Sequence, residues 1–374
     1  IISSSIPSVV AGQNSREDNA AAKPGTAAEC PVAKIVHSKV VKVRSDFRSM
    51  ADLAAFKGRI FLSFLEHCGD SDRSCIRVMS SEDGGTWETA AVVRYDEPGR
   101  YLMRRHEKRS RGFDHYCFPR LDVVPGKRLS LRIRETTTKP DDDDLQDIYD
   151  LRKVGWSSAD GTEWKYEGAL KLINGDSRTI WHGNAGFAFD FDSGVGDGAA
   201  EELWIRRTTD GAAFKLHYTY ELPKYAPRRG SLFFVGERAY FLMPRYGSGR
   251  KSKPERVRAY VNGELGTSAP PYREWTWKEI DDVICSPHVV HVPGKGPFAV
   301  VELRGARRRT SLCKLDVTTG KLTELLSLGD LRREQKGIDT HMPFGAHHMP
   351  FGLAVHQGHI WMSYCCLLYT SPSP

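Results

Sequence analysis

The sequence predicts an all-β chain that folds as a six-bladed β-propeller, and two independent repeats support this prediction. The first repeat is the heptapeptide S-x-D-G-x-x-W at residues 81–87 and 158–164. A copy at 208–214 has Thr in place of Ser and Phe in place of Trp. In such a turn the Asp carboxylate accepts hydrogen bonds from nearby backbone N–H groups, and the Gly adopts a positive φ. Because each copy follows an apolar strand, the repetition indicates a repeat architecture.

The second repeat is an apolar strand that follows a turn glycine and ends in polar or charged residues. Six segments fit this description, at 58–66, 126–134, 202–207, 236–245, 296–304 and 358–364. Their spacing of roughly 40 to 70 residues suits a four-stranded blade with its loops, so six segments predict six blades. We expect each segment to lead its blade and to line the central channel. Little sequence follows the sixth segment, which predicts that the last blade is truncated.

Composition divides the chain into three regions. Residues 1–12 are apolar and rich in small residues, and a low-complexity stretch follows them. We interpret 1–30 as a signal remnant and disordered leader; the alternative is a disordered N-terminus without a signal. The propeller is expected over 31–366, and 367–374 is interpreted as a non-native tail because it fits neither a strand nor a cap. A secreted or periplasmic protein is therefore expected, and no stretch has the roughly 18 apolar residues of a membrane span.

Charge and cysteine usage limit the partners. The 374 residues carry a formal net charge of +7, which favours anionic over cationic partners. No helix-turn-helix, zinc-finger or RNA-recognition signature is present, so nucleic acid is not an expected partner. The 8 cysteines show neither a CxxC pair nor zinc spacing, and we predict no metal and no cofactor. Cys68 and Cys75 could form a disulfide in an exported protein, and the oligomeric state is open.

Four stretches carry a family resemblance, at 52–66, 119–129, 270–277 and 310–326. With the turn repeat, they make the chain resemble the sialidase (neuraminidase) superfamily, and more closely the bacterial exo-α-sialidase-like proteins. The resemblance implies an exo-acting glycoside hydrolase that removes a terminal anionic sugar, such as sialic acid, from an anionic glycan.

Three positions depart from the group's pattern. Phe64-Leu65-Glu66 stands where the group has Phe-Arg-Glu, and Cys117-Phe118-Pro119 stands where it has Arg-Asp-Pro. Gly230-Ser231 replaces the usual Asn-Glu. Two alternatives therefore stay open: a non-catalytic carbohydrate-binding propeller with a decayed active site, and a propeller polysaccharide lyase that acts on uronic-acid polymers.

The strand repeat predicts a substrate-binding arginine cluster. Its members share one position at the end of the repeat: Arg134, Arg207, Arg245 and Arg304. Same-register side chains of equivalent strands point the same way, and guanidinium groups bind planar carboxylates or sulfates bidentately. The alternative for each is a salt-bridged strand end. Trp181 and His182 are further candidates for contact with the sugar.

The resemblance also implies catalytic roles. Tyr364 matches the place of the late-chain tyrosine nucleophile, which needs a carboxylate to accept its proton. Glu66 is the first candidate for that carboxylate, with Glu135 and Glu302 as alternatives. Asp70 and Asp52 are equal candidates for the general acid.

Overall fold

A computed structural model describes residues 2–5, 34–38, 51–67, 74–94, 114–139, 147–169, 178–191, 200–226, 229–246, 260–304, 308–327 and 350–364. Every regular element in these ranges is a β-strand, and every strand pair is antiparallel. No helix of the described part is long and apolar enough to cross a membrane. The all-β class predicted from the repeats is therefore confirmed.

The first three sheets each contain four strands that are consecutive in the chain. Sheet 1 comprises β3 (Ala51–Phe56), β4 (Arg59–His67), β5 (Ser74–Ser81) and β6 (Glu88–Arg94). Sheet 2 comprises β7 (Asp114–Val124), β8 (Arg128–Lys139), β9 (Asp147–Ser158) and β10 (Lys165–Ala169). Sheet 3 comprises β11 (Ile180–His182), β12 (Ala185–Phe191), β13 (Ala200–Thr208) and β14 (Lys215–Ala226).

Sheet 4 contains seven strands, because the long strand β18 belongs to two four-stranded units. Its members are β15 (Ser231–Val235), β16 (Arg238–Tyr246), β17 (Tyr260–Ser268), β18 (Thr276–Val292), β19 (Gly296–Arg304), β20 (Arg308–Leu315) and β21 (Leu322–Ser327). The closing sheet joins both ends of the chain: β1 (Ile2–Ser5), β2 (Lys34–Ser38), β22 (Pro350–His356) and β23 (His359–Tyr364).

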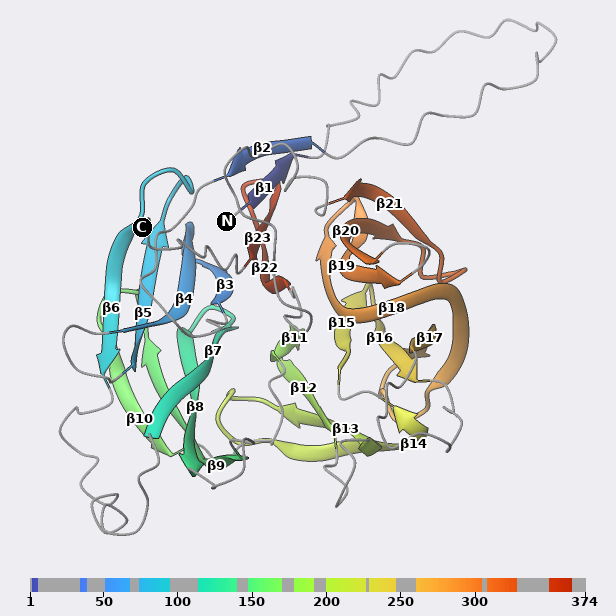
Figure 1. Ribbon diagram of the computed structural model, residues 1–374, viewed down its shortest axis with the longest axis horizontal. Coiled ribbons are helices and arrows are strands. Elements are labelled where there is room, and N and C mark those ends of the chain that lie inside the picture. Colours follow the sequence, from blue (N-terminus) through green and yellow to red (C-terminus); the bar gives the residue numbers. More distant parts are fainter. Residues whose placement is uncertain are drawn as a thin grey trace, which may run out of the picture.

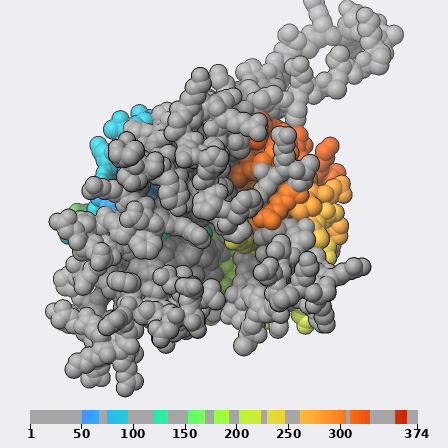
Figure 2. Space-filling model, viewed as in Figure 1, coloured from blue at the N-terminus to red at the C-terminus, as the bar shows by residue number. Residues whose placement is uncertain are grey.

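The sheets stand side by side around a common centre, in a propeller-like ring (Figure 1). The innermost strands contact one another: β3 contacts β7 and β22, and β18 contacts β15 and β22. On the face seen in Figure 2, strands of sheet 1 (blue to cyan) and the β19–β21 part of sheet 4 (orange) reach the surface on opposite sides.

The closing sheet corrects the expectation that the last blade is truncated. Its order is β2-β1-β23-β22, with Ser4 opposite Ile360 and Ser5 opposite His359. The last sheet therefore has four described strands, because the N-terminal segments β1 and β2 extend it beyond β23. Residues 2–5 pair with β2 and β23, and residues 6–30 of the predicted leader lie outside the described part of the chain. Residues 367–374 lie outside the described part of the chain.

The positions of the turn glycines also contradict the expected strand order, in which the segment after each glycine leads its blade and lies innermost. Gly58, Gly126, Gly236 and Gly358 each lie in the hairpin after an innermost strand, with φ between +55° and +75°. The segments that follow them are therefore second strands, and the strands before the glycines are the inner ones. In sheet 3 the equivalent glycine is Gly183, so the segment at 202–207 lies on β13, the third strand.

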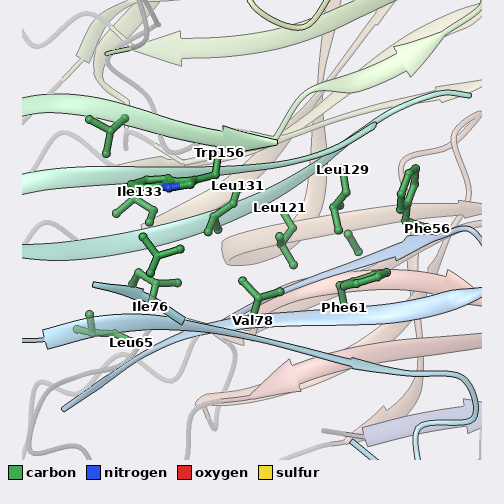
Figure 3. Close-up of a cluster of buried hydrophobic side chains, with 13 residues drawn as sticks. Phe56, Phe61, Leu65, Ile76, Val78, Leu121, Leu129, Leu131, Ile133 and Trp156 are labelled. Carbon is green, nitrogen blue, oxygen red and sulfur yellow. The ribbon is translucent and has the colours of Figure 1, made fainter. Parts of the chain in front are cut away.

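The hydrophobic core consists of apolar side chains between neighbouring sheets. Figure 3 shows the cluster between sheets 1 and 2, where Phe61, Leu65 and Ile76 face Leu131 and Trp156. All five are no more than 5% exposed. Burial of this facing apolar area holds adjacent sheets together.

The heptapeptide turns connect the third and fourth strands of sheets 1, 2 and 3. Asp83 Oδ1 accepts hydrogen bonds from the N–H groups of Gly85 (2.8 Å) and Thr86 (3.1 Å). Asp160 Oδ1 accepts from Thr162 (2.7 Å) and Glu163 (3.0 Å) in the same way. The predicted equivalence of the two turns is confirmed.

The tryptophans and glycines of these turns are equivalent too. Trp87 Nε1 donates to the carbonyl of Gly84 (2.8 Å), and Trp164 Nε1 donates to that of Gly161 (3.1 Å). A Cβ on Gly84 would overlap the indole of Trp361, in the neighbouring closing sheet. Each turn therefore requires glycine both for its positive φ and for close packing against the preceding sheet.

Candidate functional site

A layer of mostly polar residues lies at one level of the ring, five to seven residues before the hairpin glycine that follows each inner strand. Each of four residues lies six positions before a hairpin glycine of positive φ: Asp52 before Gly58, Arg120 before Gly126, His288 before Gly294 and Gly352 before Gly358. All inner strands run toward their hairpins, so equal spacing puts these residues at one level. Arg178 and Arg229, five and seven residues before Gly183 and Gly236, complete the set. We call the inner layer Asp52, Arg120, Arg178, Arg229, His288 and Gly352.

Asp52 is the centre of this layer and is completely buried. Its Oδ2 accepts a hydrogen bond from Leu121 N (2.9 Å), and its Oδ1 binds the Arg178 guanidinium. Arg120 Nη1 lies 3.9 Å from the same Oδ1. A buried carboxylate needs such partners, because desolvation without them costs several kcal/mol (order of magnitude).

Arg178 reaches from sheet 3 to two other sheets. Its guanidinium binds Asp52 and the carbonyl of Leu53 in β3, and the carbonyl of Leu353 in β22. Figure 1 shows β11 facing β3 and β22 across the centre of the ring. One side chain therefore connects sheet 3, sheet 1 and the closing sheet across the centre, at the level of the inner layer.

Gly352 allows the approach of β22 to β3. A Cβ at this position would overlap the backbone N of Leu53 and would lie 2.8 Å from Asp52 Oδ1. A larger residue would displace the carboxylate from its partners. Gly352 is therefore a packing requirement of the Asp52 site.

His288 lies half-buried in β18. Desolvation, followed by the charges of Arg120 and Arg178, lowers its pKa to about 3. Asp52 acts in the opposite direction, and Arg229 adds to the lowering. The electrostatic potential at His288 is thus positive, and its imidazole is uncharged at neutral pH.

Arg229 is held beside a distorted part of β18. Its Nη1 donates to Ser286 Oγ (2.5 Å), and Ser286 has a φ of +49°. The pairing of β18 with β19 shifts register between Cys285 and His288. A non-glycine residue with positive φ stores strain, and such strain is concentrated at functional sites.

Polar side chains also connect neighbouring inner strands. Asp122 Oδ1 accepts a hydrogen bond from Thr179 N (2.8 Å), and Arg132 pairs with its other oxygen. Ser231 Oγ accepts from Val289 N (2.9 Å). These bonds fix the residues next to Arg178 and His288, so the layer is positioned by its surroundings.

Of the predicted arginines, Arg245 and Arg304 bind acids of their own sheet. Arg245 pairs with Glu279 (2.9 Å) and Glu264 (3.4 Å), and Arg304 pairs with Glu302 (2.6 Å). Arg207 is exposed and lies on β13, the third strand of its sheet. Arg245 and Arg304 lie on second strands, so Arg207 does not share their position in the sheet. The side chain of Arg134 lies outside the described part.

The catalytic candidates are placed as follows. Glu66 binds Arg77 (2.7 Å from Nε to Oε1), and Asp52 belongs to the inner layer. Tyr364 lies opposite Pro350 in the pairing of β23 with β22, and its neighbour Ser363 donates to the carbonyl of Ala51 (3.0 Å). The backbone of Tyr364 therefore lies beside the start of β3. Its side chain and the whole of Asp70 lie outside the described part.

Trp181 and His182 lie at the hairpin end of β11, away from the inner layer. His182 Nε2 is 3.1 Å from Glu237 Oε2, and the imidazole stacks on Phe234 at 4.5 Å. Among the described residues, no three His, Cys, Asp or Glu side chains are grouped to hold a metal ion.

Sequence reasoning missed Arg120, Arg178, Arg229 and His288. It selected the strands after the turn glycines, whereas the inner strands precede them. Counting six residues backward from Gly58 and Gly126 would have identified Asp52 and Arg120. The same count reaches His288 only from Gly294, which was not one of the selected turn glycines.

No family model and no curated protein matches the chain. Its structure is similar to that of a protein of unknown function from Dyadobacter fermentans, with 13% sequence identity and a TM-score of 0.55, over 77% of this chain and 86% of that one. This likeness shows the fold alone.

Weaker likenesses connect the chain to two glycosidases. An α-L-arabinanase from Penicillium chrysogenum has 14% identity and a TM-score of 0.47, over 74% of this chain and 80% of that one. The α-L-arabinofuranosidase Arb93A from Fusarium graminearum has the same identity and TM-score, over 75% and 81%. Neither decides the chemistry of this chain.

Proposed function

We propose that this chain is a secreted, six-bladed propeller that acts as an exo-acting, sialidase-like glycoside hydrolase on a terminal anionic sugar. The six blades follow if β18 is counted in both of its four-stranded units. The observation that carries the proposed function is the inner layer, which contains Arg120, Arg178 and Arg229 together with the buried carboxylate of Asp52.

The layer suits an anion because of its charge and its position. Guanidinium groups bind carboxylates and sulfates with paired hydrogen bonds. Arg178 is engaged by Asp52 and two carbonyl groups, so it positions the layer. Arg120 and Arg229 also have partners within the protein, and we assign both of them to the sugar's anionic group.

The proposed chemistry assigns the nucleophile to Tyr364, whose backbone lies beside β3. Both oxygens of Asp52 accept bonds from the protein, which favours a positioning role for that residue. Asp70 is then the proposed general acid. A retaining mechanism would follow. Glu66 accepts the phenolic proton of Tyr364 as the tyrosine oxygen bonds to the anomeric carbon and Asp70 protonates the leaving oxygen, and water deprotonated by Asp70 then replaces the tyrosine, which takes its proton back from Glu66.

One described cysteine supports export. Cys75 is disulfide-bonded, whereas Cys285 and Cys313 are free. Disulfides form and persist in oxidising compartments such as the periplasm and the extracellular space.

A carbohydrate-binding propeller without catalysis is the second candidate, and Leu65 favours it. This residue stands where the resembled group has an arginine, and it is 5% exposed within the core between sheets 1 and 2. The side chain contributes to packing and leaves that arginine's role unfilled.

Fluorogenic conjugates test the proposal. The full chain is incubated with 4-methylumbelliferyl conjugates of sialic acid, glucuronic acid and galactose, and with a uronate polymer. We expect release from an anionic conjugate and little from the galactoside, with at least a tenfold loss in Arg229→Ala. Binding of the anionic sugars without release would favour the binding module, and unsaturated uronide products would identify a lyase. Absence of both binding and turnover would reject the proposal.

A further inference from the structure

We propose that the junction between sheets 2 and 3 is a seam at which the ring opens, and that the hydrogen bond between Asp122 and Thr179 closes it. The opening separates two neighbouring sheets while each sheet stays folded. It is a conformational property of the fold and does not depend on the proposed function.

Apolar clusters fill five junctions between neighbouring sheets, with the two four-stranded units of sheet 4 taken separately. They join sheet 1 to sheet 2, sheet 3 to the β15–β18 unit, that unit to the β18–β21 unit, the latter to the closing sheet, and the closing sheet to sheet 1. Within the described residues, no such cluster joins sheet 2 to sheet 3. Because apolar burial is the main force that holds sheets together, this junction should be the weakest.

The two faces of the seam are lined by polar and amphipathic side chains. Leu131 of β8 points toward sheet 1 (Figure 3), so strand alternation turns the adjacent Arg132 toward sheet 3. Ile205 of β13 packs against sheet 4, so Trp204 and Arg206 face sheet 2. The apolar residues of both sheets are thus used on the sides that face away from the seam.

The side chains of the seam have contacts within their own sheets. Arg132 pairs with Asp122 of the adjacent strand β7, and Arg206 lies over the ring of Trp204 at 5.3 Å. Leu216 lies opposite Arg206 in the pairing of β14 with β13, and it is 56% exposed. Sheet 2 therefore leaves the β14 side of this face uncovered.

Hydrogen bonds and one apolar contact connect the two sheets. Thr179 N–H donates to Asp122 Oδ1 (2.8 Å), and Arg128 Nη2 donates to the carbonyl of Asp210 (3.3 Å) at the exposed hairpin end. Val124 packs close to the turn that contains Asp210. Since water can replace hydrogen bonds when the sheets separate, these contacts stabilise the junction less than an apolar cluster does.

Arg178 does not close the seam, although it is next to Thr179 in the chain. Its partners are Asp52 and two carbonyl groups, which belong to sheet 1 and the closing sheet. Sheet 2 can therefore separate from sheet 3 without breaking these bonds. The bond between Asp122 and Thr179 is the inner contact that the opening breaks.

Three hydrogen bonds of one kind report on three junctions. In each, a backbone N–H at or just before one inner strand donates to a side chain of the preceding inner strand, over 2.8 to 2.9 Å. The donors are Leu121, Thr179 and Val289, and the acceptors are Asp52, Asp122 and Ser231. An apolar cluster accompanies the first and the third bond, whereas the second lies in the seam.

Native-state hydrogen exchange of the full chain, followed by NMR at urea concentrations below the unfolding transition, measures the three openings. The protection factor of Thr179 should be at least about tenfold lower than those of Leu121 and Val289. It should also change little with urea, because opening of the seam exposes little apolar surface. The protection of Leu121 and Val289 should fall steeply as urea rises.

Two variants separate the seam from the junction of sheets 1 and 2. Asp122→Asn removes the charge of the acceptor and should lower the protection of Thr179 about fivefold, with Leu121 unchanged. Leu131→Ala is the matched control, since it removes apolar contact between sheets 1 and 2. It should lower the protection of Leu121 at least about tenfold and leave that of Thr179 unchanged.

The inference is overturned if the three amides of the wild type show equal protection and equal dependence on urea. It is also overturned if Leu131→Ala lowers the protection of Thr179 as much as that of Leu121, because the seam would then open only when the whole ring unfolds. Neither result would affect the proposed function, since the measurement involves no glycan.

Discussion

Asp83 and Asp52 show two ways in which this molecule uses an aspartate. Asp83 lies in an outer turn and bonds the N–H groups of residues two and three positions later. Asp52 lies in the inner layer and bonds Leu121 and Arg178, which are 69 and 126 residues away. The first aspartate shapes one hairpin, whereas the second fixes the relative position of several sheets.

This difference has an energetic consequence. Asp83 is exposed, and water can replace its bonds when the turn opens. Backbone hydrogen bonds still lower the pKa values of Asp83, Asp160 and Asp210. Asp52 has no access to water, so removal of its partner would leave a buried charge. The inner layer should therefore respond to substitution far more strongly than the outer turns.

Arg178→Met should show the largest effect. It leaves the Asp52 carboxylate and the carbonyl groups of Leu53 and Leu353 without this partner, which predicts a loss of about 3–5 kcal/mol in the free energy of unfolding. Urea denaturation measures it. The control Arg59→Met removes a pair with the exposed Glu88 and should cost less than about 1 kcal/mol. Equal losses would contradict the contrast between layer and surface.

Gly352→Ala should cost about 1–3 kcal/mol, because the new methyl group overlaps β3 beside Asp52. Gly358→Ala is the matched control: that glycine has a φ of +73° and nothing within 4 Å of its added Cβ. Its cost comes from backbone strain alone, at about 1 kcal/mol. Thermal unfolding of both variants separates steric overlap from strain, and a milder effect at Gly352 would show that β22 can move.

His288→Gln should change how stability depends on pH. The imidazole pKa is about 3 when folded against an ordinary value of 6.5. Between these values the unfolded chain binds a proton that the folded chain does not, so wild-type stability falls as the pH drops from 6.5. The variant should lose less stability between about pH 7 and 4.5. The measurement is urea denaturation of both proteins at about pH 7 and 4.5. An equal loss of stability in the variant and the wild type would argue against an uncharged His288.

Asp160→Ala should show the smallest effect, since that carboxylate is exposed and bonded only within its own turn. Its pKa lies below the ordinary 3.8. The stabilisation is therefore present above that pH and is lost as the pH falls through the lowered value. Asp281→Ala, on the exposed part of β18, is the control. The double variant of Asp83 and Asp160 should be additive, because the turns lie in different sheets.

Features that depend on a few neighbouring residues were predicted correctly from the sequence. The heptapeptide turns and the glycines before apolar strands identified an all-β repeat, because a turn is specified by its own aspartate and glycine. Within the candidate site, Asp52 was the residue recognised in advance that the structure places in the inner layer. The catalytic candidates Tyr364 and Asp70 remain predictions.

Which strand is innermost was decided only by the tertiary structure, because a hairpin glycine marks the boundary between two strands without telling which lies nearer the centre. The closing sheet likewise depends on β1 and β23, more than 350 residues apart. Arg178 has no local motif, and its partners at positions 52, 53 and 353 meet only once the ring is closed. Local hydrogen bonds can be read from the sequence, whereas a layer assembled from several inner strands exists only after the sheets have packed around the centre.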